Sequence, residues 1–500
     1  MEALQHLLDG FAIALTPQNL FFAFLGSLIG TLIGVLPGIG TAAGTAILLP
    51  LTFQLPPTGA IIMLAAIYYG AQYGGTITSV LMSVPGEVTS VVTVFDGHPM
   101  ALNGRGGAAL SIAAIGSFIG GNIAAVGLVL AALPLTRLAL RFGPPEQFAL
   151  MVMGLALIMA LAGRSVVKTL MVGVLGLLIA MVGMDPTLGV PRFDFGQVDL
   201  MSGLDFVAVT MGLFGVSDVL LTVERKLRPV IDAKLSTLWP TRQDLKVSAG
   251  PIVRGSVIGF FLGLIPGMQP SIATFMSYIA EKKLSRYPER FGTGVIEGVA
   301  GPEATNNSFV NAALIPLFTL SIPTTPTIAV LMGAFMMNGL TPGPLLFREH
   351  PDVAWAVVAS LYIGNFILLI LNLPLIAIWV RLLKIPYSIL FAIILVFTLV
   401  GSYSLNGRVF DMGVVIVFGI LGYLLTKFDF PLAPLILTLV LGPLMERALR
   451  ASLQMSGGDF SILFSRPISA TLLVLALAFL VVSSTQFLPF KQLVSNRSED

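Results

Sequence analysis

The sequence lacks cysteine altogether, and only 10% of its 500 residues are charged. Without cysteine the chain has no disulfide, no thiol nucleophile and no cysteine-bound metal. A net charge of +2 offers no basic surface for nucleic acid. The three histidines have no metal-ligand spacing, and no HExxH, GxSxG or Walker A pattern occurs. A membrane protease or an ATP-driven pump would therefore lack its working parts, and we expect no enzymatic activity.

Long apolar runs recur along almost the whole chain, which is 56% hydrophobic with a mean hydropathy of +0.94. A helix that crosses a bilayer needs about 20 apolar residues. The sequence therefore predicts an all-α, multi-pass membrane protein surrounded by lipid. The predicted spans are 58–95 (broken), 107–133, 146–162, 166–184 and 205–222, then 293–340 (broken), 353–381, 386–404, 409–426, 430–446 and 467–487.

One short pattern occurs twice, as GSLIGTLIGVLPG at 26–38 and GSVIGFFLGLIPG at 255–267, at a constant offset (255 − 26 = 229). Glycines at every fourth position form a flat helix face, and the Pro-Gly pair interrupts the helix. We interpret this as a duplication, with repeats at 1–223 and 251–500 and a basic linker at 224–250. Broken helices in matching places of two halves indicate a transporter's substrate site, although tight packing with a kink is the alternative.

The basic residues suggest how the two copies are oriented. No lysine or arginine precedes Arg105, whereas basic stretches at 225–246 and 282–290 flank the second copy. Short basic loops prefer the cytoplasm. Both stretches lie there only if 251–281 is a re-entrant hairpin that opens to the cytoplasm. The first hairpin, 20–53, would open outward, so we expect two inverted repeats.

Each Pro-Gly pair is followed by a predicted helix start with small polar residues. The first N–H groups of a helix are unpaired and carry a partial positive charge, so they bind carboxylates. The predicted substrate residues of the two tips are Pro37, Gly38, Gly40 and Thr41, then Pro266, Gly267, Gln269, Pro270 and Ser271. The alternative is that Thr41 and Ser271 only cap their own helices.

A looser repeat relates residues 73–85 to residues 311–323 at a second offset (311 − 73 = 238). Both stretches end in serine, a hydrophobic residue and proline, which predicts a second broken helix in each half. Hydroxyls and carbonyls at membrane depth suit a hard cation such as Na⁺. We expect these breaks to supply Gly75, Thr76 and Thr324 for the substrate, and Thr78 and Thr325 for the coupling ion. Alternatively, these hydroxyls bond their own helix backbone.

The most polar stretch is 297–308, which contains Glu303, Asn306 and Asn307. Ionisable residues inside a membrane are costly and are functional candidates by default. Glu303 would carry a coupling proton or neutralise a cation, and the asparagines would ligate a cation or bond substrate oxygens. The alternative is a loop outside the membrane, because Pro302 could cap a helix just beyond the interface.

Several of these motifs resemble the large membrane subunit of tripartite tricarboxylate transporters. The matching stretches are 34–46, 73–87, 95–110, 263–285, 294–308 and 312–344. The sequence departs from the family's frequent tyrosine at His98 and glycine at Thr324. The resemblance implies a carrier of the bacterial inner membrane with two partners, a small membrane subunit and a periplasmic solute-binding protein. It also implies cation-coupled uptake of carboxylates, citrate being the prototype.

Together these features predict a secondary active transporter that imports a di- or tricarboxylate and is driven by Na⁺ or H⁺, with no other cofactor. Both hairpins would move in one block, as in an elevator. Two alternatives stay open at this point. One is a passive channel or exporter for another organic anion, and the other is a membrane scaffold or lipid-modifying enzyme.

Overall fold

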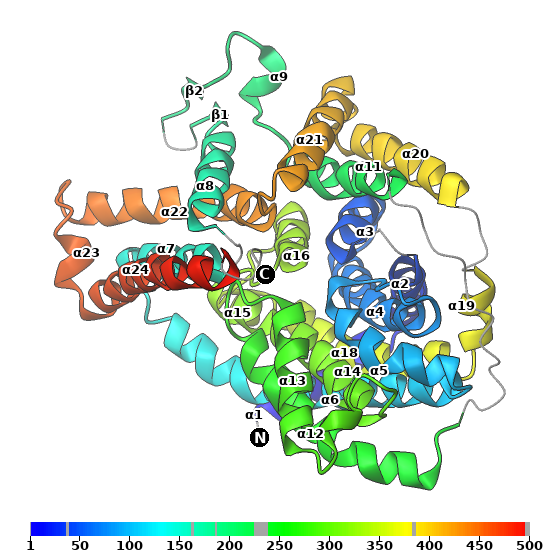
Figure 1. Ribbon diagram of the computed structural model, residues 1–500. Coiled ribbons are helices and arrows are strands. Elements are labelled where there is room, and N and C mark those ends of the chain that lie inside the picture. The colour runs from blue at the N-terminus through cyan, green and yellow to red at the C-terminus, as the bar shows by residue number, and fades with distance from the viewer. Residues whose placement is uncertain are drawn as a thin grey trace.

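The computed structural model describes residues 2–36, 40–161, 165–185, 188–224, 239–382 and 387–495. Figure 1 shows that this part of the chain is built almost entirely from helices. Eight of the described helices are long and apolar enough to cross a membrane. The predicted all-α membrane class is therefore confirmed, with one small departure. Strands β1 (Gly183–Met184) and β2 (Pro191–Arg192) form a short antiparallel pair.

The first half follows the predicted order of spans, after an N-terminal helix that the sequence analysis did not assign. That helix packs on a helix of the second half, where His6 stacks on Trp355 with 5.7 Å between the ring centroids. The elements of the first half are α1 (Glu2–Ala14), α2 (Pro17–Val35), α3 (Thr41–Leu48), η1 (Leu49–Thr52), α4 (Pro57–Met82), η2 (Val88–Ser90), α5 (Val91–Leu102), α6 (Gly106–Ala139), α7 (Pro144–Leu161), α8 (Val166–Ala180), α9 (Val198–Met201), α10 (Phe206–Thr210), η3 (Met211–Val216) and α11 (Ser217–Val223).

The second half begins earlier than predicted, because Thr241 and Asp244 form a capping box that starts a helix at Arg242. The end of the predicted linker, 242–250, is therefore helical. The predicted span at 353–381 is divided between two helices. The elements are α12 (Arg242–Gly263), α13 (Pro270–Leu284), η4 (Pro288–Arg290), α14 (Glu297–Ala312), α15 (Leu314–Leu320), α16 (Pro326–Met337), α17 (Leu346–Glu349), α18 (Pro351–Asn372), α19 (Ile376–Leu382), α20 (Tyr387–Asn406), α21 (Val409–Lys427), α22 (Ala433–Met455), α23 (Ile462–Ser465) and α24 (Pro467–Ser495).

The two glycine stripes pack against helices in the same register. A Cβ atom on Gly30 of α2 would lie 2.5 Å from the carbonyl oxygen of Ile67 in α4, so only glycine permits this approach. Gly259 of α12 meets the Thr305 carbonyl oxygen of α14 in the same way. One turn to either side, the corresponding pairs are Gly26 with Met63, Gly34 with Ala71, Gly255 with Gly301 and Gly263 with Phe309. The α14 partners follow the α4 partners by one offset (305 − 67 = 238), so both sequence offsets describe one repeated helix pair.

The helix breaks also match in backbone conformation. Helix α4 ends at Ser83 with φ 57°, and α15 ends at Ser321 with φ 59°, both in the left-handed region that side-chain-bearing residues rarely adopt. They are separated by the same offset (321 − 83 = 238). After each break a new helix starts, capped by Glu87 at η2 and by Thr325 at α16. The two halves thus share a strained turn followed by a capped helix.

Each hairpin turns back on itself. Arg254 of α12 donates from Nε to Glu281 Oε1 of α13 at 2.9 Å, so the open ends of the second hairpin lie together. In the first hairpin a Cβ atom on Gly44 of α3 would lie 2.6 Å from Cγ2 of Ile33 in α2. Helices α2 and α12 are each long enough to cross a membrane alone, so the depth at which the hairpins turn stays a prediction.

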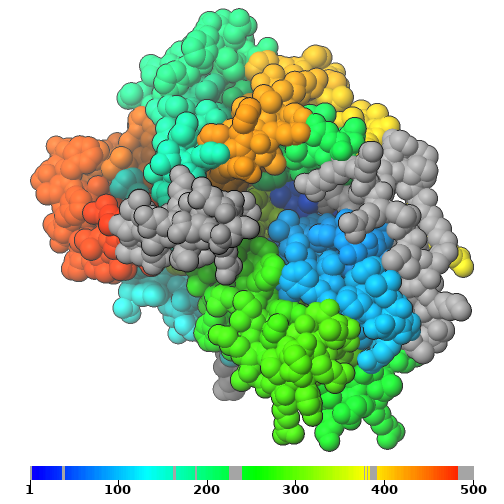
Figure 2. Space-filling model, viewed as in Figure 1, coloured from blue at the N-terminus to red at the C-terminus, as the bar shows by residue number. Residues whose placement is uncertain are grey.

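The two halves interlock through their second hairpin helices. Helix α3 packs on α16 of the second half, and α13 packs on η2 and α5 of the first. On the face shown in Figure 2, blue segments of the first half lie against green segments of the second half. The ring centroids of Phe95 and Phe275 are 5.8 Å apart. The second hairpin helix is thereby brought beside the first-half break, where the Thr274 hydroxyl donates to the Thr89 carbonyl oxygen at 3.1 Å.

Candidate functional site

The first hairpin tip ends at a helix start that no side chain of its own caps. Gly40 is the N-cap residue, and its N–H donates to a carboxylate oxygen of Asp218 in α11 at 3.3 Å. Helix α3 begins at Thr41, whose hydroxyl accepts a hydrogen bond from Gln72 Nε2 at 3.2 Å. The alternative in which Thr41 caps its own helix is therefore wrong.

A second carboxylate lies at the same helix start. The carboxyl group of Glu87 faces the side chain and the backbone N–H of Thr41, and the residue is only 7% exposed. Gly75 leaves room for it, because a Cβ atom there would lie 3.0 Å from Glu87 Cβ. The other predicted residues of this tip, Pro37 and Gly38, lie outside the described residues.

The second tip is fixed on the break of its own half. Pro266 and Gly267 form the turn, where Gly267 has φ 80°. The Gly267 N–H donates to the carbonyl oxygen of Thr324 at 3.1 Å. The hydroxyl of Thr324 in turn donates to the Ala313 carbonyl oxygen at 3.2 Å. Thr324 thus positions the turn with its backbone and stabilises the break with its side chain.

The helix that follows this tip also starts without a side-chain cap. Gln269 is the N-cap residue of α13 and Pro270 is the first helical residue, but the Gln269 side chain accepts no bond from the helix. Ser271 is half-buried in the first turn, and its hydroxyl is not the cap, against the alternative stated above. Within the described chain no carboxylate bonds to this helix start, in contrast to the first tip.

One chain of hydrogen bonds joins the two tips. Gln72 Nε2 donates to the Thr41 hydroxyl at the start of α3, and the Thr89 hydroxyl donates to Gln72 Oε1 at 2.7 Å. The Thr274 hydroxyl of α13 donates to the Thr89 carbonyl oxygen at 3.1 Å. All four residues are at most 5% exposed. The two helix starts are therefore parts of one polar assembly.

Glu303 lies in the middle of α14 and is 1% exposed, so it is not in a loop, and its depth in the membrane stays a prediction. Its carboxylate accepts hydrogen bonds from the hydroxyls of Thr76, at 2.8 Å, and Thr93. Asn307 Nδ2 donates to the Ser117 hydroxyl at 2.7 Å, and Ser117 also lies against Glu303. Thr76, predicted to bind substrate, is thus tied to the predicted ion residues Glu303 and Asn307.

The other predicted ion residues have different neighbours. Thr78 donates to the Gly75 carbonyl oxygen at 3.0 Å, and the Thr325 hydroxyl accepts from Ile328 N at 3.3 Å. Both hydroxyls therefore form hydrogen bonds with the backbone of their own helix, as the alternative for these residues expected. Asn306 is 1% exposed, and neither polar atom of its side chain has a hydrogen-bond partner in the described part of the chain.

Sequence reasoning missed the residues that connect these groups, because they lie on other helices than the motifs they contact. Only Gln72 carried a signal, since it is a lone amide within the apolar run of α4. The missed residues are Gln72, Thr89, Thr93, Ser117 and Asp218.

Comparison with known proteins agrees with this geometry. The model of the tripartite tricarboxylate transporter TctA family matches residues 20–437, which include both hairpins and the Glu303 cluster. The chain belongs to the TctA family.

Curated relatives of this TctA-family chain come from Agrobacterium vitis. One, named "Uncharacterized 52.8 kDa protein in TAR-I ttuC' 3'region", is 47% identical over 484 residues, covering 97% of this chain and 96% of the relative. Another, named "Uncharacterized protein in TAR-II ttuC' 3'region", is 47% identical over 225 residues, covering 45% of this chain and 93% of the relative. No solved structure matches the chain.

Membership of the TctA family determines the general role of the molecule. It is a multi-pass transport protein of the bacterial inner membrane and not an enzyme. It functions in a tripartite system with other subunits, and the family is one of tricarboxylate transporters.

Proposed function

We propose that this TctA-family protein is the membrane carrier of a secondary active system that takes up di- or tricarboxylates such as citrate, driven by Na⁺ or H⁺. One observation carries the proposal. Helix α4 bears both Gln72, which contacts the first tip, and Thr76, which contacts Glu303. Residues four apart lie on one face of a helix. A change at Glu303 therefore reaches the tips through one helical turn, which is the connection that a coupled carrier needs.

The chemistry of the tips supports a carboxylate substrate. At the first tip the N–H groups of Gly40 and Thr41 face the carboxylates of Asp218 and Glu87, so this helix start accommodates that group. The start of α13 has no side-chain cap. A di- or tricarboxylate would place one carboxylate near Ser271. A second carboxylate of the substrate would take the place of the Asp218 or Glu87 side chain at the first tip.

Two inverted repeats and an elevator motion belong to the same proposal. The glycine stripes, the strained serines and the interlocked hairpins match between the halves and support a common origin of the two repeats. Arg105, which follows the first break, forms a salt bridge of 2.6 Å with Asp244, which precedes the second hairpin. This contact supports the placement of both residues on the same side of the membrane. Because the hairpins interlock, a rigid movement would carry both tips together.

The partners follow from the family. We infer that a periplasmic solute-binding protein delivers the carboxylate and that a small membrane subunit completes the complex. The binding protein would contribute much of the selectivity among carboxylates.

The test is uptake of labelled citrate and small dicarboxylates into proteoliposomes that contain all three components, with Na⁺ and pH gradients imposed separately. Accumulation against the concentration gradient that follows one ion gradient supports the coupled carrier. Ser271→Ala and Asn306→Ala should reduce it. Ser404→Ala is the matched control, because that exposed hydroxyl only bonds its own helix at Val400.

Two results would contradict the proposal. Uptake that merely equilibrates and ignores both gradients would support the passive channel. No uptake of any carboxylate by a folded, assembled complex would refute this substrate class.

A further inference from the structure

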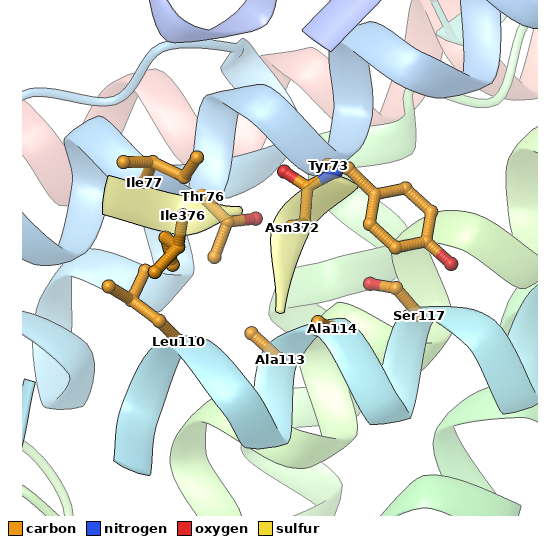
Figure 3. A pocket seen from close by; sticks show the side chains of 9 residues that line it. All are labelled: Tyr73, Thr76, Ile77, Leu110, Ala113, Ala114, Ser117, Asn372 and Ile376. Atoms are coloured by element: carbon orange, nitrogen blue, oxygen red, sulfur yellow. The ribbon is translucent and has the colours of Figure 1, made fainter. Parts of the chain in front are cut away.

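A small, partly open void lies beside the Glu303 cluster, between α4, α6 and the end of α18. Figure 3 shows Thr76, Ser117 and Asn372 around it, together with Tyr73 and apolar side chains. Its volume is about 10 Å³, which is room for one particle the size of a water molecule. The void is therefore too small for a carboxylate substrate but large enough for a monatomic ion.

The charge next to this void is negative and has no cationic partner in the described chain. Thr76 and Ser117, which line the void, both lie against Glu303. The partners of the Glu303 carboxylate among the described residues are hydroxyls. A buried carboxylate without a counter-charge is costly inside a membrane, so it requires either a proton or a bound cation.

One unpaired acceptor lines the void itself. Asn372 is 3% exposed and lines the void, its Nδ2 donates to the Leu368 carbonyl oxygen at 3.0 Å, and its Oδ1 has no partner among the described residues. Asn307 and Asn311 likewise donate through Nδ2 to α6 and keep an unpaired Oδ1. For Asn372 and Asn311, the bond to a backbone carbonyl oxygen assigns which end of the amide is the oxygen.

The unpaired carboxamide oxygen of Asn372 at the void and the carboxylate of Glu303 beside it create a negative potential that favours a cation. The ligand types are hydroxyl, carboxamide and carboxylate oxygen, which suit hard cations. A divalent ion would need more negative charge, and the described residues contain no group of three acidic or histidine side chains. The void and its lining therefore fit a small monovalent ion.

We propose that Na⁺ binds in this void, with Thr76 Oγ1, Ser117 Oγ and Asn372 Oδ1 as oxygen ligands and Glu303 as the counter-charge behind the hydroxyls. Thr76 and Ser117 keep their contacts with Glu303 while their oxygen lone pairs face the ion. Only the role of Na⁺ as the coupling ion rests on the proposed carrier function. The binding itself does not depend on a carboxylate substrate.

The test is thermal unfolding of the purified full-length protein in equal concentrations of NaCl, KCl and choline chloride, without substrate. A ligand that binds only the folded state raises the unfolding temperature with concentration. We expect NaCl to raise it above KCl and choline chloride, in a saturable way. Asn372→Leu and Thr76→Val should each weaken the apparent Na⁺ affinity on the order of tenfold or more.

Two matched variants separate ion binding from folding. Asn122→Leu removes an amide that also bonds its own helix, at Phe118 with 2.7 Å, but does not line the void, so its response to Na⁺ should stay intact. Thr76→Ser keeps the hydroxyl and should keep the response that Thr76→Val loses.

Equal unfolding temperatures in NaCl and KCl would overturn the sodium site, and so would a Na⁺ response that survives both Asn372→Leu and Thr76→Val. If uptake then followed the pH gradient alone, Glu303 would carry a proton and the carrier function would stand. Conversely, specific Na⁺ binding without any carboxylate uptake would support the site and refute the proposed transport function.

Discussion

The two halves of this protein share their backbone packing but differ in the side chains at its centre. At the offset that relates α4 to α14, Tyr69 corresponds to Asn307 and Tyr73 to Asn311 (311 − 73 = 238). The tyrosines of α4 reach α18, where Tyr69 contacts the Ser360 carbonyl oxygen at 3.4 Å. The asparagines of α14 reach α6 in the same way. The two halves thus share one backbone arrangement, and different polar residues at corresponding positions contact different helices.

The centre of this difference is Glu303. The corresponding residue of the first half is Ala65 (303 − 238 = 65), which is buried and has no polar side chain. The hydroxyls that bond Glu303, from Thr76 and Thr93, come from the first half. Each half therefore contributes one part of the proposed ion site, and neither would form it alone.

Removing the Glu303 charge should have the largest effect on transport. Glu303→Gln keeps the shape, and its one carboxamide oxygen accepts from one of the Thr76 and Thr93 hydroxyls while its NH2 group faces the other. It loses the counter-charge for a cation. We expect ion-driven carboxylate accumulation in proteoliposomes to fall on the order of a hundredfold. Asp9→Asn, on an exposed position of α1, is the control. Accumulation that survives in Glu303→Gln would remove Glu303 from the coupling site.

The glycine stripes test whether the two halves pack alike. Gly30→Ala and Gly259→Ala each place a Cβ atom too close to a carbonyl oxygen of the facing helix. We expect each to lower the free energy of unfolding by about 1–3 kcal/mol. Gly413→Ala, where no atom lies within 4 Å, should be neutral or stabilise by up to about 1 kcal/mol. A loss of stability in only one of the two variants would contradict the correspondence between the halves.

The tips should differ in how a lost hydroxyl affects stability. Thr41 is held in the bridge to Gln72, whereas the Ser271 hydroxyl does not cap its helix. Thr41→Ala should therefore lower both the unfolding temperature and substrate affinity. Ser271→Ala should raise the substrate concentration at half-maximal uptake by about tenfold, because it removes a hydrogen bond to a charged substrate. Its unfolding temperature should change little. A parallel loss of stability in both variants would argue for purely structural roles.

The smallest expected effect concerns the two strained serines. Replacing a left-handed serine by glycine relieves backbone strain, so Ser83→Gly should raise the free energy of unfolding by about 1 kcal/mol. Ser321→Gly gains the same relief but loses the hydrogen bond from the Ser321 hydroxyl to the Pro342 carbonyl oxygen at 2.6 Å. It should therefore be close to neutral. Destabilisation of Ser83→Gly in chemical unfolding would contradict the assigned strain.

Much of the helix packing could be predicted from the sequence, because short local patterns determine the close helix contacts and the helix breaks. The glycine register predicted which helix faces touch closely, and the Ser-hydrophobe-Pro signature marked both left-handed breaks before any contact was known. The start of α12 was placed too late, since Thr241 and Asp244 form a capping box inside a stretch that its basic residues suggested was a linker.

The site itself could be predicted only in part. Glu303 was identified from its type, because an ionisable residue in an apolar segment is rarely accidental. Its partners Thr93 and Ser117 lie on α5 and α6, and ordinary hydroxyls on distant helices carry no signal of their own. Asp218 lies near the end of the last span of the first half, and only the fold brings it to Gly40.

The most direct test of the central claim, that both tips belong to one substrate site exposed to each side in turn, is cysteine accessibility. The natural chain has no cysteine, so Thr41→Cys and Ser271→Cys give single labelling positions without further changes. With a membrane-impermeant thiol reagent, we predict that each position reacts from either side, that the accessible side changes with the ion gradient, and that carboxylate protects both. Labelling of each position from one side only, under all conditions, would contradict the alternating-access account.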